Sequence, residues 1–197
     1  MKILISSFGP FHNFENNPSE LIMNELKHEF NFDLKKSIDW KVIPVTYKAV
    51  DALYNDNIIN KYNYIIHLGV ATNFDKLRIE INAHNSISGN DIDGFEPGNQ
   101  IINNGNEIIS SNFPFEVIDY ILIKYKDEVV ISDDAGRYLC NYIYYKSLYH
   151  FKNESKVIFI HIADFKNNNK ALSIEIQKKI INDFVEYLIH KENQNLT

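Results

Sequence analysis

Short apolar segments that alternate with longer helical patterns constrain the fold of this chain more than any other feature. Six segments have the composition or the alternation of β-strands, at residues 2–6, 40–45, 64–68, 76–83, 128–132 and 156–160. Helical patterns follow most of them, beginning at Ser19 as an N-cap and then at residues 48–61, 114–126, 139–152 and 172–192. This alternation predicts an α/β fold, a three-layer α/β/α sandwich with a mainly parallel central sheet. Pro44 predicts that the second strand lies near a sheet edge.

The composition predicts one globular domain over residues 1–197. A chain of 197 residues, 45 % apolar and 13 % aromatic, is long enough for a sizeable core and short for two domains. Residues 84–113 are polar, rich in Gly and Asn, and weakly periodic. Such a long irregular segment in a compact domain is typically a functional or a mobile loop.

Composition also indicates the cellular compartment of the protein and excludes some classes of binding partner. The single cysteine excludes an intrachain disulfide, which fits a reducing compartment. The apolar run at the N-terminus is too short for a signal peptide, and no run approaches the ~20 residues that span a bilayer. The net charge of −6, without a basic stretch interleaved with aromatics, argues against nucleic acid. We therefore expect a cytoplasmic protein with no membrane or nucleic-acid partner, whose oligomeric state the sequence leaves open.

Cys140 stands where the strand at 128–132 gives way to the helix at 139–152. A thiol in the first turn of a helix meets unpaired backbone N–H groups and the positive end of the helix dipole, and both favour the nucleophilic thiolate. Gly136 suits the sharp turn between the two elements. The same position is equally consistent with the alternative that Cys140 is a small buried apolar residue and not a nucleophile, since most free cysteines are of that kind.

A cysteine nucleophile needs a base, normally histidine, and a group that orients this base. Sites in α/β sheets lie at the carboxyl ends of the strands, and this position leaves His67, His84 and His161 as candidates. Glu80 lies in the polar phase of the strand at 76–83 and is the candidate for orienting the base, although a solvent-facing residue would give the same pattern. Spacing does not choose among the histidines. The phosphate-loop, dinucleotide and His-Glu-x-x-His metal motifs are absent.

Five blocks of the chain, in order, resemble those of the pyroglutamyl-peptidase I family, which consists of cysteine omega-peptidases. The fourth block is most similar to the animal-type version, with Asp-Ala-Gly-Arg-Tyr-Leu-Cys. The blocks are Phe8-Gly9-Pro10-Phe11 with Asn17-Pro18-Ser19, His67-Leu68-Gly69, Arg78-Ile79-Glu80 with His84-Asn85, Ser132 to Tyr145, and Phe159-Ile160-His161-Ile162.

The resemblance implies an enzyme that removes N-terminal pyroglutamate (5-oxoproline) from peptides through a thioester acyl-enzyme, without a metal or another cofactor. By match of position it makes Cys140 the nucleophile, His161 the general base and acid, and Glu80 the residue that orients His161. It leaves His67 with a structural or pocket-wall role. The substrate is a flat, neutral lactam, which calls for apolar walls and a few polar partners. The candidates for these walls are Phe8, Phe11, Val70, Tyr138 and Leu139.

The chain departs from the family pattern in three places. Val70 stands where many bacterial members carry Gln, so a side-chain hydrogen bond is not available there. Ala163 and Asp164 follow the histidine block where family members often have Pro. Residues 86–106 match poorly, and we expect them to form a flap over the site. Two rival interpretations are a catalytically silent relative that binds pyroglutamyl peptides and, on fold analogy alone, a phosphorylase-like enzyme acting on nucleosides.

Overall fold

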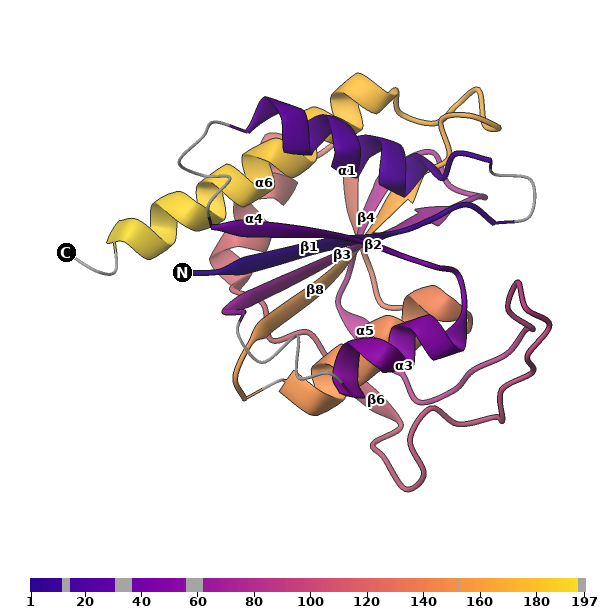
Figure 1. Ribbon diagram of the computed structural model, residues 1–197. Helices are drawn as coiled ribbons and strands as arrows, with labels where there is room; N and C mark the ends of the chain where they lie inside the picture. The colour runs from indigo at the N-terminus through magenta and orange to yellow at the C-terminus, as the bar shows by residue number, and fades with distance from the viewer. Residues whose placement is uncertain (12–14, 31–36, 56–61, 152, 195–197) are drawn as a thin grey trace.

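The computed structural model describes residues 1–11, 15–30, 37–55, 62–151 and 153–194, and it places a six-stranded sheet between two layers of helices (Figure 1). The strand order is β2 (Ile38–Ile43), β1 (Ile3–Phe8), β3 (Tyr64–Ala71), β8 (Lys156–Ala163), β4 (Leu77–Glu80) and β7 (Val129–Ser132). One face is covered by α1 (Pro18–Glu29), α4 (Phe115–Lys124) and α6 (Ile174–Gln194), and the other by α3 (Tyr47–Asn55) and α5 (Leu139–Phe151). The predicted α/β fold is confirmed.

The strands do not all run in one direction. Strands β2, β1, β3 and β8 are mutually parallel, whereas β4 pairs antiparallel with β8 and parallel with β7. Because of this reversal, Arg78 near the start of β4 lies opposite His161 near the end of β8. The sheet is therefore mainly parallel, as predicted, and β2 is an edge strand, as Pro44 predicted.

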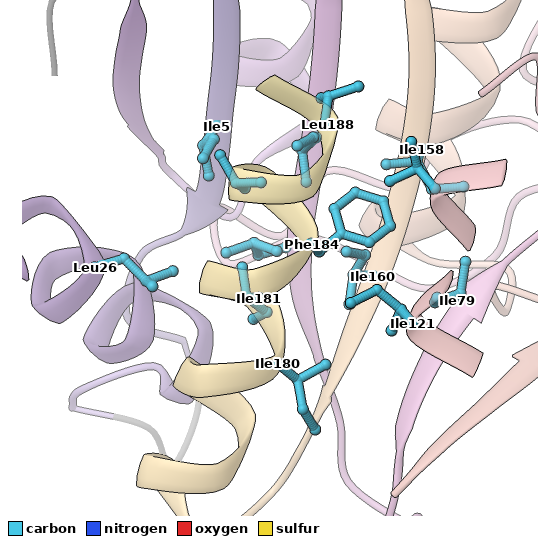
Figure 2. Packing of buried hydrophobic residues seen from close by; sticks show 14 of the residues in the cluster. Ile5, Leu26, Ile79, Ile121, Ile158, Ile160, Ile180, Ile181, Phe184 and Leu188 are labelled. Atoms are coloured by element: carbon cyan, nitrogen blue, oxygen red, sulfur yellow. The ribbon is translucent and has the colours of Figure 1, made fainter. Parts of the chain in front are cut away.

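Two apolar cores hold the sheet from both faces. Along β1, Ile3 and Ile5 enter the core beneath α1 and α6, whereas Leu4 and Phe8 enter the core beneath α3 and α5. Figure 2 shows Phe184 of α6 among isoleucines of the sheet. Full burial of one such side chain contributes about 1.5–3 kcal/mol. Strand β8 is thus packed on both faces, which makes it a rigid support for His161.

Some strand boundaries differ from the predicted ones, because pairing with a neighbouring strand determines where a strand ends. Strands β3 and β8 both run further than predicted, because they pair with each other as far as Ala71 and Ala163. The predicted strand at 76–83 is interrupted at Ile81, whose N–H donates to the Ser132 carbonyl. Its second part, β5 (Asn82–His84), pairs with β6 (Ile108–Ser110) in a separate two-stranded sheet.

The first helix begins two residues earlier than a Ser19 N-cap would give, so that prediction is wrong. Asn17 is the N-cap, since its side-chain oxygen accepts from the Ser19 N–H at 3.0 Å, and Pro18 follows at the start of the helix. Proline is favoured there because its φ is already helical and its missing N–H costs nothing in the first turn. The predicted helix at 48–61 is described as far as Asn55, and residues 56–61 and 152 lie outside the described residues. None of the described helices combines the length and the apolar character that crossing a bilayer requires.

Candidate active site

A cavity of about 450 Å³ opens over the carboxyl ends of β1, β3 and β8 and brings together most of the predicted site residues. Its walls include seven of them, namely Phe8, Phe11, Val70, Tyr138, Leu139, Cys140 and His161. The eighth, Glu80, does not line the cavity and is completely buried beside it. The lining also includes the polar and charged residues Asn17, Thr72, Asn73, Arg78, Asp134 and Arg137.

Cys140 is the second residue of α5 and is half-buried in the cavity wall. The Tyr142 N–H donates to the Tyr138 carbonyl at 2.9 Å, which closes the first turn of the helix. The N–H groups of Leu139, Cys140 and Asn141 precede that bond and have no acceptor within the helix. The thiol of Cys140 therefore lies in the first turn of α5, among backbone N–H groups without a helical acceptor, as its position in the sequence predicted.

Residues 132–139 carry the chain from β7 to α5 through a tight turn. Gly136 adopts a φ of 82°, in the left-handed region that favours glycine, and its N–H donates to Asp134 Oδ1 at 2.9 Å. Arg137 forms an ion pair with the same carboxylate. Asn141 fixes the start of α5 from the other side, because its amide exchanges hydrogen bonds with the His84 backbone and donates to the Ser86 carbonyl. No sequence pattern singled out Asn141 within its block, because its two partners come from a separate strand and loop.

Gly69 makes room for the thiol. It lies on β3 directly opposite His161 on β8. A Cβ at this position would lie 2.8 Å from Cys140 Sγ and 2.6 Å from Phe159 Cζ, closer than real Cβ contacts. Only glycine therefore lets α5 bring Cys140 against the sheet next to His161.

His161 joins Cys140 to a buried carboxylate. Its Nδ1–H donates to Glu80 Oε1 at 2.8 Å, and its ring also forms a hydrogen bond with Cys140. The exposed fractions are 6 % for His161 and 0 % for Glu80. Burial alone would lower the pKa of His161, but the hydrogen bonds and charges of Cys140 and Glu80 outweigh it and raise the pKa to about 9. Near neutral pH this histidine is accordingly an imidazolium beside the thiol.

The other two candidate histidines lack these neighbours. His67 is buried, with Ser6 Oγ 2.6 Å from Nδ1 and Ser147 Oγ 2.8 Å from Nε2. Burial lowers the pKa of His67 to about 3, so it stays neutral, and its role is structural. His84 lies at the end of β5, with its Nε2 3.1 Å from the Asp133 carbonyl. Of the three histidines, only His161 contacts both the thiol and a carboxylate.

Residues 86–106 do not form the predicted flap, because none of them lines the cavity. They lie behind its Tyr138 wall instead. The Tyr138 hydroxyl donates to the Asn90 carbonyl at 3.1 Å, and the Ser88 N–H donates to the Arg137 carbonyl at 2.7 Å. Asp91 stabilises this arrangement through hydrogen bonds from the backbone N–H groups of Tyr47, Asp93 and Phe95.

Within the described residues, the structure has no group of three or more His, Cys, Asp and Glu side chains placed to hold an ion. Cys140, His161 and Glu80 instead contact one another in a chain, and this arrangement suits nucleophilic attack by a thiolate with an imidazolium as its partner.

Comparison with known proteins identifies the family of this chain. The sequence model of the pyroglutamyl peptidase family matches residues 1–173. Pyroglutamyl-peptidase 1 of Homo sapiens is 31 % identical over 168 residues, covering 81 % of this chain and 78 % of that protein, and the Rattus norvegicus protein is 32 % identical with the same coverage. The crystal structure of pyrrolidone carboxyl peptidase from Thermus thermophilus has a TM-score of 0.81 at 26 % identity, covering 93 % of this chain and 98 % of that one. This chain belongs to the pyroglutamyl peptidase family.

Proposed function

We propose that this protein is a cysteine peptidase that removes N-terminal pyroglutamate from peptides through a thioester acyl-enzyme, and that residues 1–197 act as a single peptidase domain. The observation that carries the proposal is the placement of His161, which contacts both Cys140 and the buried Glu80 at the wall of one cavity. Membership of the pyroglutamyl peptidase family supports the substrate class. The proposed roles are nucleophile for Cys140, general acid and base for His161, and orienting carboxylate for Glu80.

Acylation begins with attack of the Cys140 thiolate on the pyroglutamyl carbonyl carbon. The tetrahedral oxyanion accepts hydrogen bonds from backbone N–H groups at the start of α5, including that of Cys140. The His161 imidazolium donates its proton to the departing nitrogen, the carbon–nitrogen bond breaks and the shortened peptide leaves. The products of this step are a thioester on Cys140 and a neutral His161.

Deacylation reverses the proton movement. Water attacks the thioester carbonyl while neutral His161 takes one of the water protons. The carbon–sulfur bond then breaks, pyroglutamate is released, and the thiolate and imidazolium are restored. Glu80 holds Nδ1 throughout, so the ring presents its other nitrogen to the reacting atoms.

The cavity suits a small neutral ring. Phe8 and Phe11 are the proposed stacking partners of the lactam, and Val70, Tyr138 and Leu139 complete an apolar wall. Strand β1 pairs with β3 only as far as Leu68, so residues 69–71 extend past that ladder. Their backbone groups on the β1 side are the proposed partners of the lactam N–H and carbonyl.

The rival interpretations predict different behaviour. A silent binding relative would have no use for an imidazolium shared between a thiol and a buried carboxylate, which is the arrangement at His161. A nucleoside phosphorylase would require phosphate, whereas the proposed peptidase requires none.

The test is release of aminomethylcoumarin from its pyroglutamyl derivative under reducing conditions and without phosphate. Prolyl- and glutaminyl-aminomethylcoumarin are the matched controls, since one lacks the lactam carbonyl and the other lacks the ring. We expect release from the pyroglutamyl compound alone. A folded protein that releases nothing would support the silent relative, and equal release from the prolyl compound would contradict lactam recognition.

The raised pKa of His161 predicts the alkaline limit of acylation. Because this pKa is raised from 6.5 to about 9, the imidazolium is present throughout the neutral range and is lost as the pH rises through about 9. We therefore expect kcat/KM for the coumarin substrate to fall above about pH 9. A pH profile of kcat/KM checks this, and a profile that keeps rising through that region would contradict an imidazolium as the acid.

Gly69→Ala is expected to damage both activity and stability. Its Cβ must displace Cys140 Sγ and Phe159, and overpacking of this kind costs about 1–3 kcal/mol in the free energy of unfolding. Misplacement of a reacting atom by about 1 Å lowers the rate about 100-fold. Gly98→Ala is the matched control, because a Cβ there has no heavy atom within 4 Å. Denaturant unfolding and kcat/KM of the two variants check this, and equal behaviour would contradict the proposed role of Gly69.

A further inference from the structure

Arg78 lines the same cavity as Cys140 and His161, and the mechanism above gives it no task. It lies on β4 two residues before Glu80, and residues two apart on a strand point to the same face. Its Cα is paired with that of His161 across β4 and β8. Strand β4 therefore directs a guanidinium and a carboxylate to the same side of the sheet, next to His161.

The guanidinium of Arg78 is held in place on three sides. Its Nε donates to Glu80 Oε1 at 3.4 Å, and this is the same oxygen that accepts from His161 Nδ1. Its Nη2 donates to Ser132 Oγ at 2.5 Å, and the Phe74 ring lies 3.8 Å from the guanidinium carbon. The side chain is 18 % exposed, so this ion pair is much less screened by water than a surface pair would be.

The charges around Glu80 change during the reaction. Before acylation, the negative charge of the Cys140 thiolate is balanced by the positive charge of the His161 imidazolium. The negative charge of Glu80 is balanced in the same way by Arg78. After acylation, the thioester and the imidazole are both neutral, and the Glu80 carboxylate keeps its charge at 0 % exposure. A buried carboxylate without a positive partner is costly, so it would draw a proton from solvent onto His161. An imidazolium cannot accept the proton of the hydrolytic water.

We propose that Arg78 is a positioning residue for deacylation, which neutralises Glu80 in the acyl-enzyme and so keeps His161 available as the base. This inference rests on the proposed thioester mechanism. It assigns to Arg78 a role in thioester hydrolysis that is distinct from the acylation role of the imidazolium.

The remaining ionisable groups around the pair do not replace Arg78. From α5, Tyr144 donates its hydroxyl to the Glu80 backbone carbonyl, and burial raises the pKa of Tyr144, so it stays neutral. Asp134 and Arg137 in the turn before α5 form an ion pair with each other. His84 lies near Asp134, and its positive form would act on that carboxylate.

The test compares two substrates with the Arg78→Gln variant. A pyroglutamyl p-nitrophenyl ester has an activated leaving group, so its kcat measures deacylation, whereas kcat/KM for the coumarin amide measures acylation. We expect Arg78→Gln to lower kcat for the ester about tenfold or more near neutral pH, which corresponds to one unit in the pKa of the acyl-enzyme imidazole. The acid limb of this kcat should move to higher pH, while kcat/KM for the amide changes less than about threefold.

Three further variants make the outcome decisive. Arg78→Lys retains the charge and should restore most of the ester kcat. Arg78→Met keeps the apolar packing on Phe74 and should behave as Arg78→Gln does, which covers the case in which the glutamine variant fails to fold. In a Glu80→Gln background there is no carboxylate to neutralise, so adding Arg78→Gln should have little further effect.

Equal losses of ester kcat and amide kcat/KM, with no shift of the acid limb, would overturn the role of Arg78. An additive loss in the Glu80→Gln background would do the same. Both outcomes presuppose that the parent protein hydrolyses the two pyroglutamyl substrates. Failure of the parent would instead reject the proposed function, so the two failures are distinguishable.

Discussion

Cys140→Ser should abolish turnover of the pyroglutamyl coumarin, with a loss of about 10⁵-fold or more in kcat. The site holds an imidazolium, whose pKa of about 9 makes it a partner for a thiolate. A serine hydroxyl does not ionise beside an imidazolium, and near neutral pH too little neutral imidazole is present to activate it. The loss is checked by fluorophore release at high protein concentration.

Cys140→Ala is the companion variant. Neither replacement is larger than cysteine, so the close approach to Gly69 stays free of strain and thermal unfolding should stay close to that of the parent. A folded alanine variant that keeps more than about one per cent of the parent rate would contradict Cys140 as the nucleophile and would point to a different group or to a contaminating peptidase.

Glu80→Gln should lower kcat/KM about 10²- to 10⁴-fold, the range over which loss of an orienting carboxylate acts in related catalytic arrangements. Glutamine preserves the shape of the side chain but removes the charge that raises the pKa of His161. Removing an anion lowers the pKa of a neighbouring imidazolium, so the alkaline limb of kcat/KM should also move below about pH 9.

The control for this variant is Glu116→Gln, because Glu116 is an exposed residue at the start of α4. It should leave both the rate and the pH profile unchanged. A Glu80→Gln variant with a normal rate, or with an unmoved alkaline limb, would show that Glu80 does not act on His161.

Much of the fold could be predicted because apolar periodicity reports which face of an element is buried. The alternation of strands and helices predicted the layered architecture, and Pro44 predicted an edge position for β2. Periodicity carries no information on strand direction, and the reversal of β4 and β7 was not predicted for that reason. The same reversal decides that Arg78 lies opposite His161.

The site could be predicted in part. Position in the sequence singled out Cys140 but left three histidines open, and only the family resemblance selected His161. The choice depends on contacts between residues that are far apart in the chain, such as the 2.8 Å bond from His161 to Glu80 across 81 positions. Gly69 belongs to one of the matched blocks, but its role in making room for Cys140 was not predicted, because that role follows from the approach of α5.

The loop at 86–106 shows how composition can mislead. Its Gly and Asn content predicted irregular backbone correctly, but it does not say where such a segment lies. Asp91 and Asn85 accept hydrogen bonds from backbone N–H groups in and around the loop and hold it behind Tyr138. The loop therefore supports the Tyr138 wall of the cavity and does not cover the cavity as a flap.

The most direct test of the proposed mechanism is labelling with a pyroglutamyl chloromethyl ketone, which places the lactam in the cavity and an alkylating carbon at the scissile position. The thiolate displaces chloride, and mass spectrometry locates the new bond. We predict one label per chain, on Cys140, with activity lost in proportion, and no label from the prolyl analogue at the same concentration. Inactivation with the label on another residue, or normal turnover by a chain that is fully labelled at Cys140, would contradict it.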